Sequence, residues 1–441
     1  MARTRRIKLP TLASTVGTAL EWYDFSLYGT AAALVLPAVF FPSGDPTLAL
    51  LSSLATFAVG FFARPIGGVI IGILGDRFGR RQMLFVTLLL MAASSVLIGV
   101  LPTYAQVGVL APTLLVVLRV LQGLGAGGEY AGAMLLSAEH ASDHNRGLNA
   151  SIPSVGNAVG SVIATAIFFL FQGVLPQAAF LAWGWRIPFL LSIVLAVAGI
   201  IIRLRVTDSP EFTAAVASRG VVRSRFVDMF KLSGRRVPLA MLMSIAPNVL
   251  SYLPSVYALT YLSTVVGAPA WIGLVGIIIA NLLKLVTIPT AGWLSDRFGG
   301  KPIMIIGSVA GAVLFYPFFF MLNTGTPVVI WAALVIIFTL CCDMTLASQA
   351  SLLSNLFHVR VRYTAVTFSR EITGAIVGGT LPFVAAWLTA ASGGAPWLVC
   401  VYCGILCVIC AIGTAFLPSA RKAPETDSDI GIAVIPVANA N

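Results

Sequence analysis

Charged side chains are scarce in this sequence of 441 residues: Asp, Glu, Lys and Arg make up 10% of it. A soluble domain carries roughly 25% charged residues, because its surface must meet water. Hydrophobic residues make up 58% of the chain, and its mean hydropathy is +0.96. The alternating short segments of a membrane barrel are missing as well. The composition therefore excludes a soluble protein and predicts an all-α membrane protein surrounded by the lipid bilayer.

Histidine is scarce too, and the few histidines argue against a membrane enzyme. His140, His144 and His358 are the only three, and all fall at or near loops. The Gly-rich stretch 123–128 lies inside an apolar run with no preceding strand, so it does not resemble a nucleotide-binding loop. We expect no enzymatic activity, no ATP-driven transport and no cofactor.

Cysteine is present in six copies, four of them in two CxxC pairs. In a soluble protein such pairs would suggest zinc. Here they fall within one apolar helix and spread over about 15 Å, at a rise of 1.5 Å per residue. They cannot all reach one ion, so we expect no metal site at Cys400, Cys403, Cys407 and Cys410.

Long apolar runs are abundant, and many reach the roughly 20 residues needed to cross a hydrocarbon core. Runs of this kind are helices, because backbone amides in lipid must be satisfied within their own segment. The sequence predicts twelve spans, near residues 12–36, 49–74, 83–101, 107–138, 149–173, 187–204, 237–264, 270–294, 303–322, 327–355, 363–390 and 396–417.

Basic residues gather in the loops on one side of these spans, which is the pattern of cytoplasmic loops. The loops on the other side, near 37–48, 102–106, 265–269, 323–326 and 391–395, have no Lys or Arg, and Arg186 is the lone exception. We therefore expect a bacterial-type inner membrane protein with both termini in the cytoplasm. The net charge of +11 is this bias summed over many loops, and it does not indicate nucleic acid.

A repeat divides the chain into two halves. Residues 72–81, GILGDRFGRR, recur as residues 292–301, GWLSDRFGGK, at an offset of 220 residues. Two six-helix halves are the plan of an alternating-access transporter with its substrate near mid-membrane. The expected parts are an N-terminus 1–11, bundles 12–204 and 237–417, a central loop 205–236 and a flexible tail 418–441. Charges of the repeated loops could latch the halves together, with gating roles for Asp76, Arg77, Arg80, Asp296 and Arg297.

The paired loops resemble the signature of the major facilitator superfamily. Further stretches resemble its metabolite:proton symporter family, which includes carriers of shikimate, 2-oxoglutarate, citrate and proline/betaine. They are GTALEWYDF at 17–25, RPIGG at 64–68, RVLQGLGAGGEY at 119–130 and WGWRIPF at 183–189. The resemblance, over about residues 12–417, implies twelve helices in two pseudo-symmetric six-helix bundles, the major facilitator fold. It also implies proton-driven uptake of a small, usually carboxylated, metabolite.

Ionisable residues inside spans are costly, so each is a site hypothesis. Glu21, Asp24 and Tyr28 share one helix face at spacings of three and four residues. Two carboxylates close together in a cleft that excludes water repel each other, and such a pair can hold a proton. We expect Asp24 to carry the proton, with Glu21 as second candidate and Tyr28 near the substrate. The alternative is that both acids are structural partners of Arg64 or Arg119.

The fourth span places Arg119 and Gln122 on a face that continues toward Glu129. The resemblance implies a role for Arg119 in proton coupling, with Glu129 beside it. Alternatively Arg119 binds a substrate carboxylate through its planar fork, with Gln122 as neighbour. A third reading is a permanent ion pair with an acid. We expect Arg64 to have a gating or structural role rather than to bind substrate.

The second half departs from the family pattern: shikimate-type carriers have a small residue at position 284, and an aromatic and a neutral polar residue at 370 and 371. Lys284 and Arg370 would suit an anionic substrate, unless Asp343 and Glu371 neutralise them. The seventh span carries Asn248, Tyr252, Tyr257 and Tyr261 and is interrupted by Pro247 and Pro254. We expect substrate contacts from Tyr257, Lys284, Asp343 and Arg370.

These expectations combine into a proton-coupled symporter that imports a small organic anion by rocking its two halves. Protonation of a first-helix carboxylate would release it from an arginine and favour substrate binding. Two alternatives stay open: uptake of a zwitterionic osmolyte such as proline or betaine, and proton-driven efflux. The expected partners are the organic anion, protons and the lipid bilayer, and a monomer is the default for this fold.

Overall fold

The computed structural model describes residues 9–78, 80–127, 146–205, 226–357 and 361–418. Helices dominate the described residues, and no strand occurs among them. The elements of the first half are α1 Leu9–Leu34, α2 Leu36–Phe40, α3 Pro46–Phe78, α4 Arg80–Val100, α5 Tyr104–Val107, α6 Leu110–Ala126, α8 Arg146–Val174, α9 Gln177–Ala179, η2 Phe180–Gly184 and α10 Arg186–Arg205.

The second half is built in the same way, but three of its six spans are composite. A short helix precedes it, α12 Phe226–Ser233. Three spans are single helices: α16 Ala270–Phe298, α17 Gly300–Leu322 and α22 Trp397–Ala415. The seventh span consists of α13 Arg236–Met243, α14 Ile245–Tyr252, η3 Leu253–Tyr257, α15 Ala258–Tyr261 and η4 Leu262–Val266. The tenth consists of α18 Pro327–Ile336, η5 Ile337–Cys342 and α19 Asp343–Leu356, and the eleventh of α20 Arg362–Thr373, η6 Gly374–Gly379 and α21 Leu381–Ala391.

Helices of the described residues occupy each of the twelve ranges that the apolar runs predict, and α1 supplies the first of them. In the described part of the chain, eight helices are long and apolar enough to cross a membrane, or up to nine with the bent pair Gln177–Gly184 and Arg186–Gly199. Two shorter apolar helices, Phe85–Val100 and Leu110–Ala126, supply the third and fourth spans. The fourth span begins as expected, but the rest of its predicted range, 128–138, lies outside the described residues. The all-α membrane fold is confirmed.

The three composite spans change from α-helix to π-helix near their middles, at η3, η5 and η6. In the seventh span the change falls at Leu253–Tyr257, around Pro254, which cannot donate a backbone hydrogen bond. In the eleventh span it falls on the glycine-rich stretch Gly374–Gly379. A π-helical turn shifts the side chains that follow it and is often found at functional sites. All three lie in the second half, and two of them contact the first half: η3 packs against α1 and η6 against α3.

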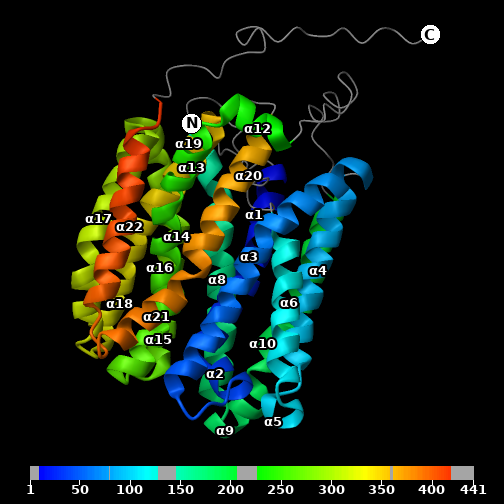
Figure 1. Ribbon diagram of the computed structural model, residues 1–441, viewed down its shortest axis with the longest axis vertical. Helices are drawn as coiled ribbons and strands as arrows, with labels where there is room; N and C mark the ends of the chain where they lie inside the picture. The colour runs from blue at the N-terminus through cyan, green and yellow to red at the C-terminus, as the bar shows by residue number, and fades with distance from the viewer. Residues whose placement is uncertain (1–8, 79, 128–145, 206–225, 358–360, 419–441) are drawn as a thin grey trace, which may run out of the picture.

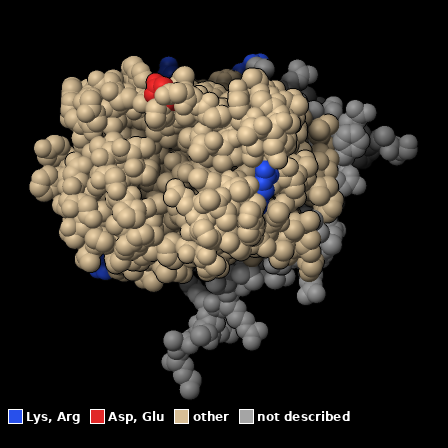
Figure 2. Space-filling view, turned by 90° about the horizontal axis from the view of Figure 1, so that it is seen from below, with Lys and Arg blue, Asp and Glu red and all other residues tan. Residues whose placement is uncertain are grey.

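The two halves stand side by side and meet along their length (Figure 1). Helix α8 of the first half packs along α16 and α19 of the second, while α3 packs against α20, η6 and α21. Helix α12, which carries Lys231, lies at one end of the bundle (Figure 1), and we call this the basic end. Arg236 begins α13, Arg297 stands in the last turn of α16, and Lys301 stands at the start of α17. Figure 2 looks onto the opposite end, which carries α2, α5 and α9, and shows few charged side chains among the described residues.

Candidate functional site

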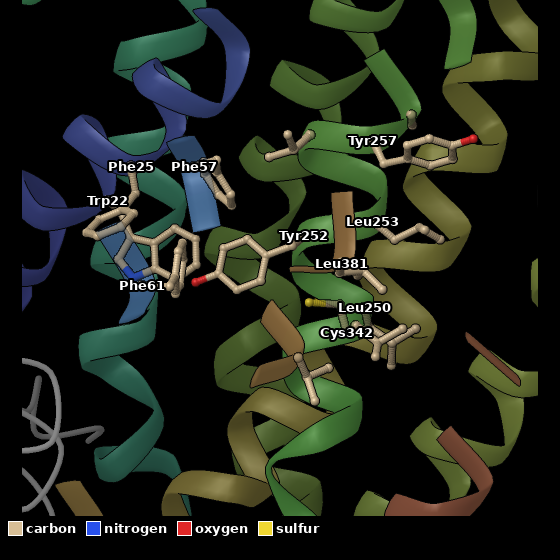
Figure 3. Packing of buried hydrophobic residues seen from close by; sticks show 14 of the residues in the cluster. Trp22, Phe25, Phe57, Phe61, Leu250, Tyr252, Leu253, Tyr257, Cys342 and Leu381 are labelled. Carbon is tan, nitrogen blue, oxygen red and sulfur yellow. The ribbon is translucent and has the colours of Figure 1, made fainter. Parts of the chain in front are cut away.

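Aromatic side chains from both halves meet in the middle of the bundle (Figure 3). The ring of Trp22 on α1 stacks on the ring of Tyr252 on α14, with centroids 5.7 Å apart and planes 7° apart. Phe57 and Phe61 on α3 meet the same tyrosine edge-on, at 6.0 and 5.1 Å. Tyr252 therefore reaches across the interface and contacts three aromatic rings of the first half.

A cluster of four charged side chains lies one helical turn from these rings. Nη2 of Arg64 is 2.5 Å from Oε1 of Glu21, and Nε of Arg64 is 2.6 Å from Oε2 of Glu371. Nη1 of Arg370 lies 3.1 Å from the other oxygen of Glu371. We call Glu21, Arg64, Arg370 and Glu371 the bridging cluster, because Arg64 binds one carboxylate from each half.

The bridging cluster is buried, and its four described side chains comprise two cations and two anions. Side chains of Arg64, Glu21 and Glu371 are 5% exposed or less, and Arg370 is 13% exposed. Taking ions out of water costs several kcal/mol each, unless partners of opposite charge and hydrogen bonds replace the lost solvation. The guanidinium of Arg64 also lies over the ring of Phe25, 4.8 Å from its centroid. Separating the halves at this level would break the Arg64–Glu371 pair.

A second polar network lies inside the first half and links Asp24 to Arg119. The hydroxyl of Ser192 donates to Oδ1 of Asp24 at 3.0 Å, and the hydroxyl of Ser95 interacts with the same carboxylate. Nε2 of Gln122 donates to Ser95 at 2.7 Å, and Nη1 of Arg119 donates to Oε1 of Gln122 at 2.5 Å. Asp24 and Arg119 are thus connected through neutral side chains and not by a direct ion pair.

Arg119 is fully buried, and backbone carbonyls compensate much of its charge. Its guanidinium donates to the carbonyl oxygens of Thr56 at 3.3 Å and Phe57 at 3.1 Å, and it lies 3.8 Å from the centroid of the Tyr28 ring. Tyr28 in turn hydrogen-bonds the hydroxyl of Thr56 at 2.5 Å. Within the described part of the chain no carboxylate pairs with Arg119; the expected neighbour Glu129 lies outside the described residues.

Lys284 and Asp343 form a third charged group, wholly inside the second half. Nζ of Lys284 lies 3.7 Å from Oδ1 of Asp343, and the side chains are 2% and 0% exposed. The hydroxyl of Thr287 donates to the other carboxylate oxygen, and Lys284 lies 4.3 Å from the centroid of the Phe338 ring. Position 284 is position 64 plus the repeat offset of 220, so this lysine is the counterpart of Arg64 in the second half.

The seventh span places its tyrosines in two different environments. Tyr257 hydrogen-bonds the hydroxyl of Thr389 and packs against Tyr261 and Phe319, inside the second half. Tyr252, one π-helical turn earlier, faces the first half. Sequence reasoning chose Tyr257 for the site and did not rank Tyr252, Trp22 or Phe61. The one signal for Tyr252 was its place before Pro254, in a span whose helix is interrupted.

At the basic end, the repeated loop of the second half contacts the first half. The backbone amide of Leu148 donates to Oδ2 of Asp296 at 2.9 Å, in the first turn of α8. A carboxylate is favoured there, because the first amides of a helix lack partners and carry partial positive charge. Arg297 lies over the rings of Trp293 and Phe298. The side chains of Asp76, Arg77 and Arg80 lie outside the described residues.

Comparisons with known proteins agree with this architecture. Two family models match, one for sugar and other transporters over residues 10–223 and one for major facilitator and sugar transport proteins over residues 241–430. The chain is also similar to a D-xylose–proton symporter of known structure, with a TM-score of 0.72 and 22% identity over 93% of this chain and 98% of the other. At this identity the likeness bears on the fold alone.

Relatives with higher identity extend over almost the whole chain. The inner membrane metabolite transport protein YhjE of Escherichia coli is 38% identical, over 86% of this chain and 87% of the relative. The shikimate transporter of Escherichia coli is 35% identical over 96% of both chains. The proline/betaine transporter of Escherichia coli is 34% identical, over 88% of this chain and 79% of the relative. The protein is thus a transporter of small molecules and not an enzyme, and it belongs to the metabolite:proton symporter family of the major facilitator superfamily.

Proposed function

We propose that this protein imports a small organic anion together with protons, by alternating access. The observation that carries the proposal is the bridging cluster, in which Arg64 is bound by carboxylates of both halves. A guanidinium offers carboxylates two edges, each of which carries a pair of N–H groups. If a proton neutralises one glutamate, Arg64 keeps the other partner and can receive the carboxylate of a substrate. Proton binding and substrate binding would then favour each other at one arginine.

The network around Asp24 supports a second proton-binding group in the first half. Its hydrogen-bond partners are the hydroxyls of Ser192 and Ser95, which can donate to a carboxylate and accept from a carboxylic acid. Asp24 could therefore gain or lose a proton without losing its partners. The change would reach Arg119 through Gln122, so we assign Asp24 and Arg119 to proton coupling, with Glu21 as the acid at the substrate.

Uptake of a zwitterion is the second candidate, and two observations favour it. The described side chains of the bridging cluster include two cations and two anions, which suits a substrate that carries one charge of each sign. The stacked rings of Trp22 and Tyr252 lie next to it, and faces of aromatic rings attract quaternary ammonium groups. A carboxylate would still meet Arg64, while an ammonium group would meet the rings.

We also propose that the basic end faces the cytoplasm, together with both termini, because cytoplasmic loops of membrane proteins are rich in Lys and Arg. In the conformation described, Asp296 and the Arg64–Glu371 pair join the halves toward this end. The halves also meet toward the other end, where α1 contacts α15. The molecule would thus be closed on both sides, as in the step between outward and inward opening. We take a monomer as the transport unit.

Purified protein in proteoliposomes tests the proposal. Labelled shikimate, 2-oxoglutarate, citrate and glycine betaine are offered with and without an inward proton gradient. We expect a carboxylate to accumulate and the accumulation to collapse with an uncoupler. Accumulation of betaine without any carboxylate would favour the second candidate. Uptake that does not depend on the proton gradient would contradict both candidate functions.

A further inference from the structure

The Lys284–Asp343 pair of the second half is held less tightly than the ion pairs of Arg64. Nζ and Oδ1 are 3.7 Å apart, too far for a hydrogen bond, whereas Nη2 of Arg64 lies 2.5 Å from Glu21. Oδ1 of Asp343 is buried and accepts no hydrogen bond from the described residues. The other oxygen accepts from Thr287. A proton can therefore bind at Oδ1 without breaking a hydrogen bond of the carboxylate.

The contacts of the Lys284 ammonium group are weak as well. Nζ donates to the thiol of Cys342 at 3.7 Å and lies over the ring of Phe338, 4.3 Å from its centroid. A thiol is a weak hydrogen-bond acceptor. Among the described residues, the other titratable groups that face the carboxylate are the thiols of Cys341 and Cys342. A proton on Asp343 would thus leave Lys284 as a buried cation in need of another anion.

The pair lies on two helices that border the first half. Lys284 belongs to α16 and Asp343 begins α19, and both helices pack along α8. The thiol of Cys342 also shares a hydrogen bond of 3.4 Å with the hydroxyl of Ser251. Ser251 directly precedes Tyr252, whose ring contacts the first half. Hydrogen bonds thus connect the ammonium group to the span that reaches across the interface.

The internal repeat relates this pair to Arg64, because each half carries a buried cation at the same repeat position, beside a carboxylate. We infer that Lys284 and Asp343 form a second substrate subsite, which binds an anionic group when Asp343 takes up a proton. The inference rests on the proposed function and deepens it, since it makes the substrate a dicarboxylate, with one group at Arg64 and one at Lys284. At Lys284 the charge stays balanced, because the proton on Asp343 removes the negative charge that the second carboxylate adds.

Competition between matched acids tests the substrate class. The full chain is reconstituted in proteoliposomes, and labelled 2-oxoglutarate and succinate are offered with an inward proton gradient, beside labelled shikimate. Unlabelled 2-oxopentanoate and butyrate are the competitors, because each has the carbon chain of one of these dicarboxylates and a single carboxylate. We expect the dicarboxylate to compete at least about tenfold better than its analogue, the factor that one hydrogen-bonded charge supplies.

A neutral version of the pair tests the place of the subsite. Lys284→Met with Asp343→Asn leaves no buried charge alone, so we expect the protein to fold. KM for the dicarboxylate should rise by about tenfold or more, while competition by the analogue stays within about threefold. The number of protons per substrate, measured from the reversal potential, should fall by one. Thr290→Ala is the matched control on α16, because this hydroxyl is exposed and donates to the carbonyl of Val286.

The outcomes separate the inference from the proposed function. If the wild type accumulates shikimate and no dicarboxylate, or if the neutral pair weakens both kinds of acid alike, the inference is wrong while the proposed function stands. If the wild type accumulates no carboxylate, both fail. A loss confined to the second carboxylate, with one proton fewer per substrate, would support the inference. Lys284→Gln with Asp343→Asn is a second neutral pair, in case the first does not reach the membrane.

Discussion

At the scale of single residues, this protein keeps charges inside a membrane by three different means. Arg119 is compensated by backbone carbonyls and the face of Tyr28, Arg64 by two glutamates, and Lys284 by one aspartate. Each buried ion avoids the cost of standing alone. The partners differ in whether a proton can change their charge, because a carboxylate can be neutralised by a proton and a backbone carbonyl cannot.

The pair of Lys284 and Asp343 is expected to behave as a stability unit. Lys284→Met should leave Asp343 buried without a cation and destabilise the protein by about 3–5 kcal/mol. Asp343→Asn should leave Lys284 buried without an anion, and the double variant should recover most of the stability lost in the single variants. The measurement is thermal unfolding of the detergent-solubilised protein. Strictly additive losses would show that the two side chains do not depend on each other.

Asp24 is expected to be needed for coupling and not for the fold. Asp24→Asn keeps the shape of the side chain and its hydroxyl partners, so the protein should still insert and exchange substrate. Proton-driven accumulation should fall by about tenfold or more, as is typical when an acid that transfers protons is lost. Ser26→Ala, on the same helix but hydrogen-bonded to Ser161, is the control and should transport normally. Unchanged proton-dependent accumulation in Asp24→Asn would remove it from the coupling role.

At the scale of elements, glycines set how closely helices approach. A Cβ atom on Gly160 of α8 would collide with the carbonyl oxygen of Ala19 on α1 and lie 2.8 Å from the amide of Tyr23. Gly156, one turn earlier, meets the carbonyl of Thr15 in the same way. Small residues at such spacing allow backbones to touch in a membrane. The α1–α8 contact matters for function, because α1 carries Glu21, Trp22 and Asp24.

Gly160→Ala should therefore push α8 away from α1 and destabilise the protein by about 1–3 kcal/mol, the usual cost of overpacking. Gly173→Ala, near the end of the same helix, is the matched control. No atom lies within 4 Å of a Cβ at that position, and alanine favours helix over glycine by up to about 1 kcal/mol. Both are compared by thermal unfolding and by transport rate. An equal effect of the two changes would mean that close approach is not what Gly160 provides.

At the scale of the whole molecule, the halves are joined toward both ends, and transport requires them to part at one end at a time. Away from the basic end, a Cβ on Gly29 of α1 would lie 2.7 Å from Cγ2 of Val256 in the second half. Gly29 and Val256 thus face each other closely across the interface, so a disulfide between cysteines at the two positions can be tested. Such a bond would prevent opening on that side and leave the other side unchanged.

Gly29→Cys with Val256→Cys, in a background without the six native cysteines, should lose transport on oxidation and regain it with a reducing agent. Uptake into proteoliposomes measures the effect, and each single cysteine variant is the control. Gly29→Cys alone lowers activity if the site is as tight as the distance to Val256 indicates. Full uptake by the oxidised double variant, with the disulfide verified by mass, would contradict the rocking of two halves.

The sequence by itself determined the membrane class, the twelve spans, the two halves and the candidate site residues inside the spans. Apolar length and the cost of buried charge act locally, and both can be read from the order of residues. The π-helical turn at Leu253–Tyr257 could be anticipated from Pro254, although its effect on Tyr252 could not. The family followed from short motifs whose spacing is preserved in this chain.

Only the tertiary structure decided which of the candidate site residues contact one another. Arg64 and Glu371 are 307 residues apart, and no periodicity relates α3 to α20. Consecutive Arg370 and Glu371 cannot point to one spot on a straight helix, yet both join the bridging cluster, because long side chains can converge where their backbones diverge. Lys284 stands at the repeat position of Arg64 but pairs within its own half. Partners across an interface depend on how two bundles pack, which local sequence patterns do not record.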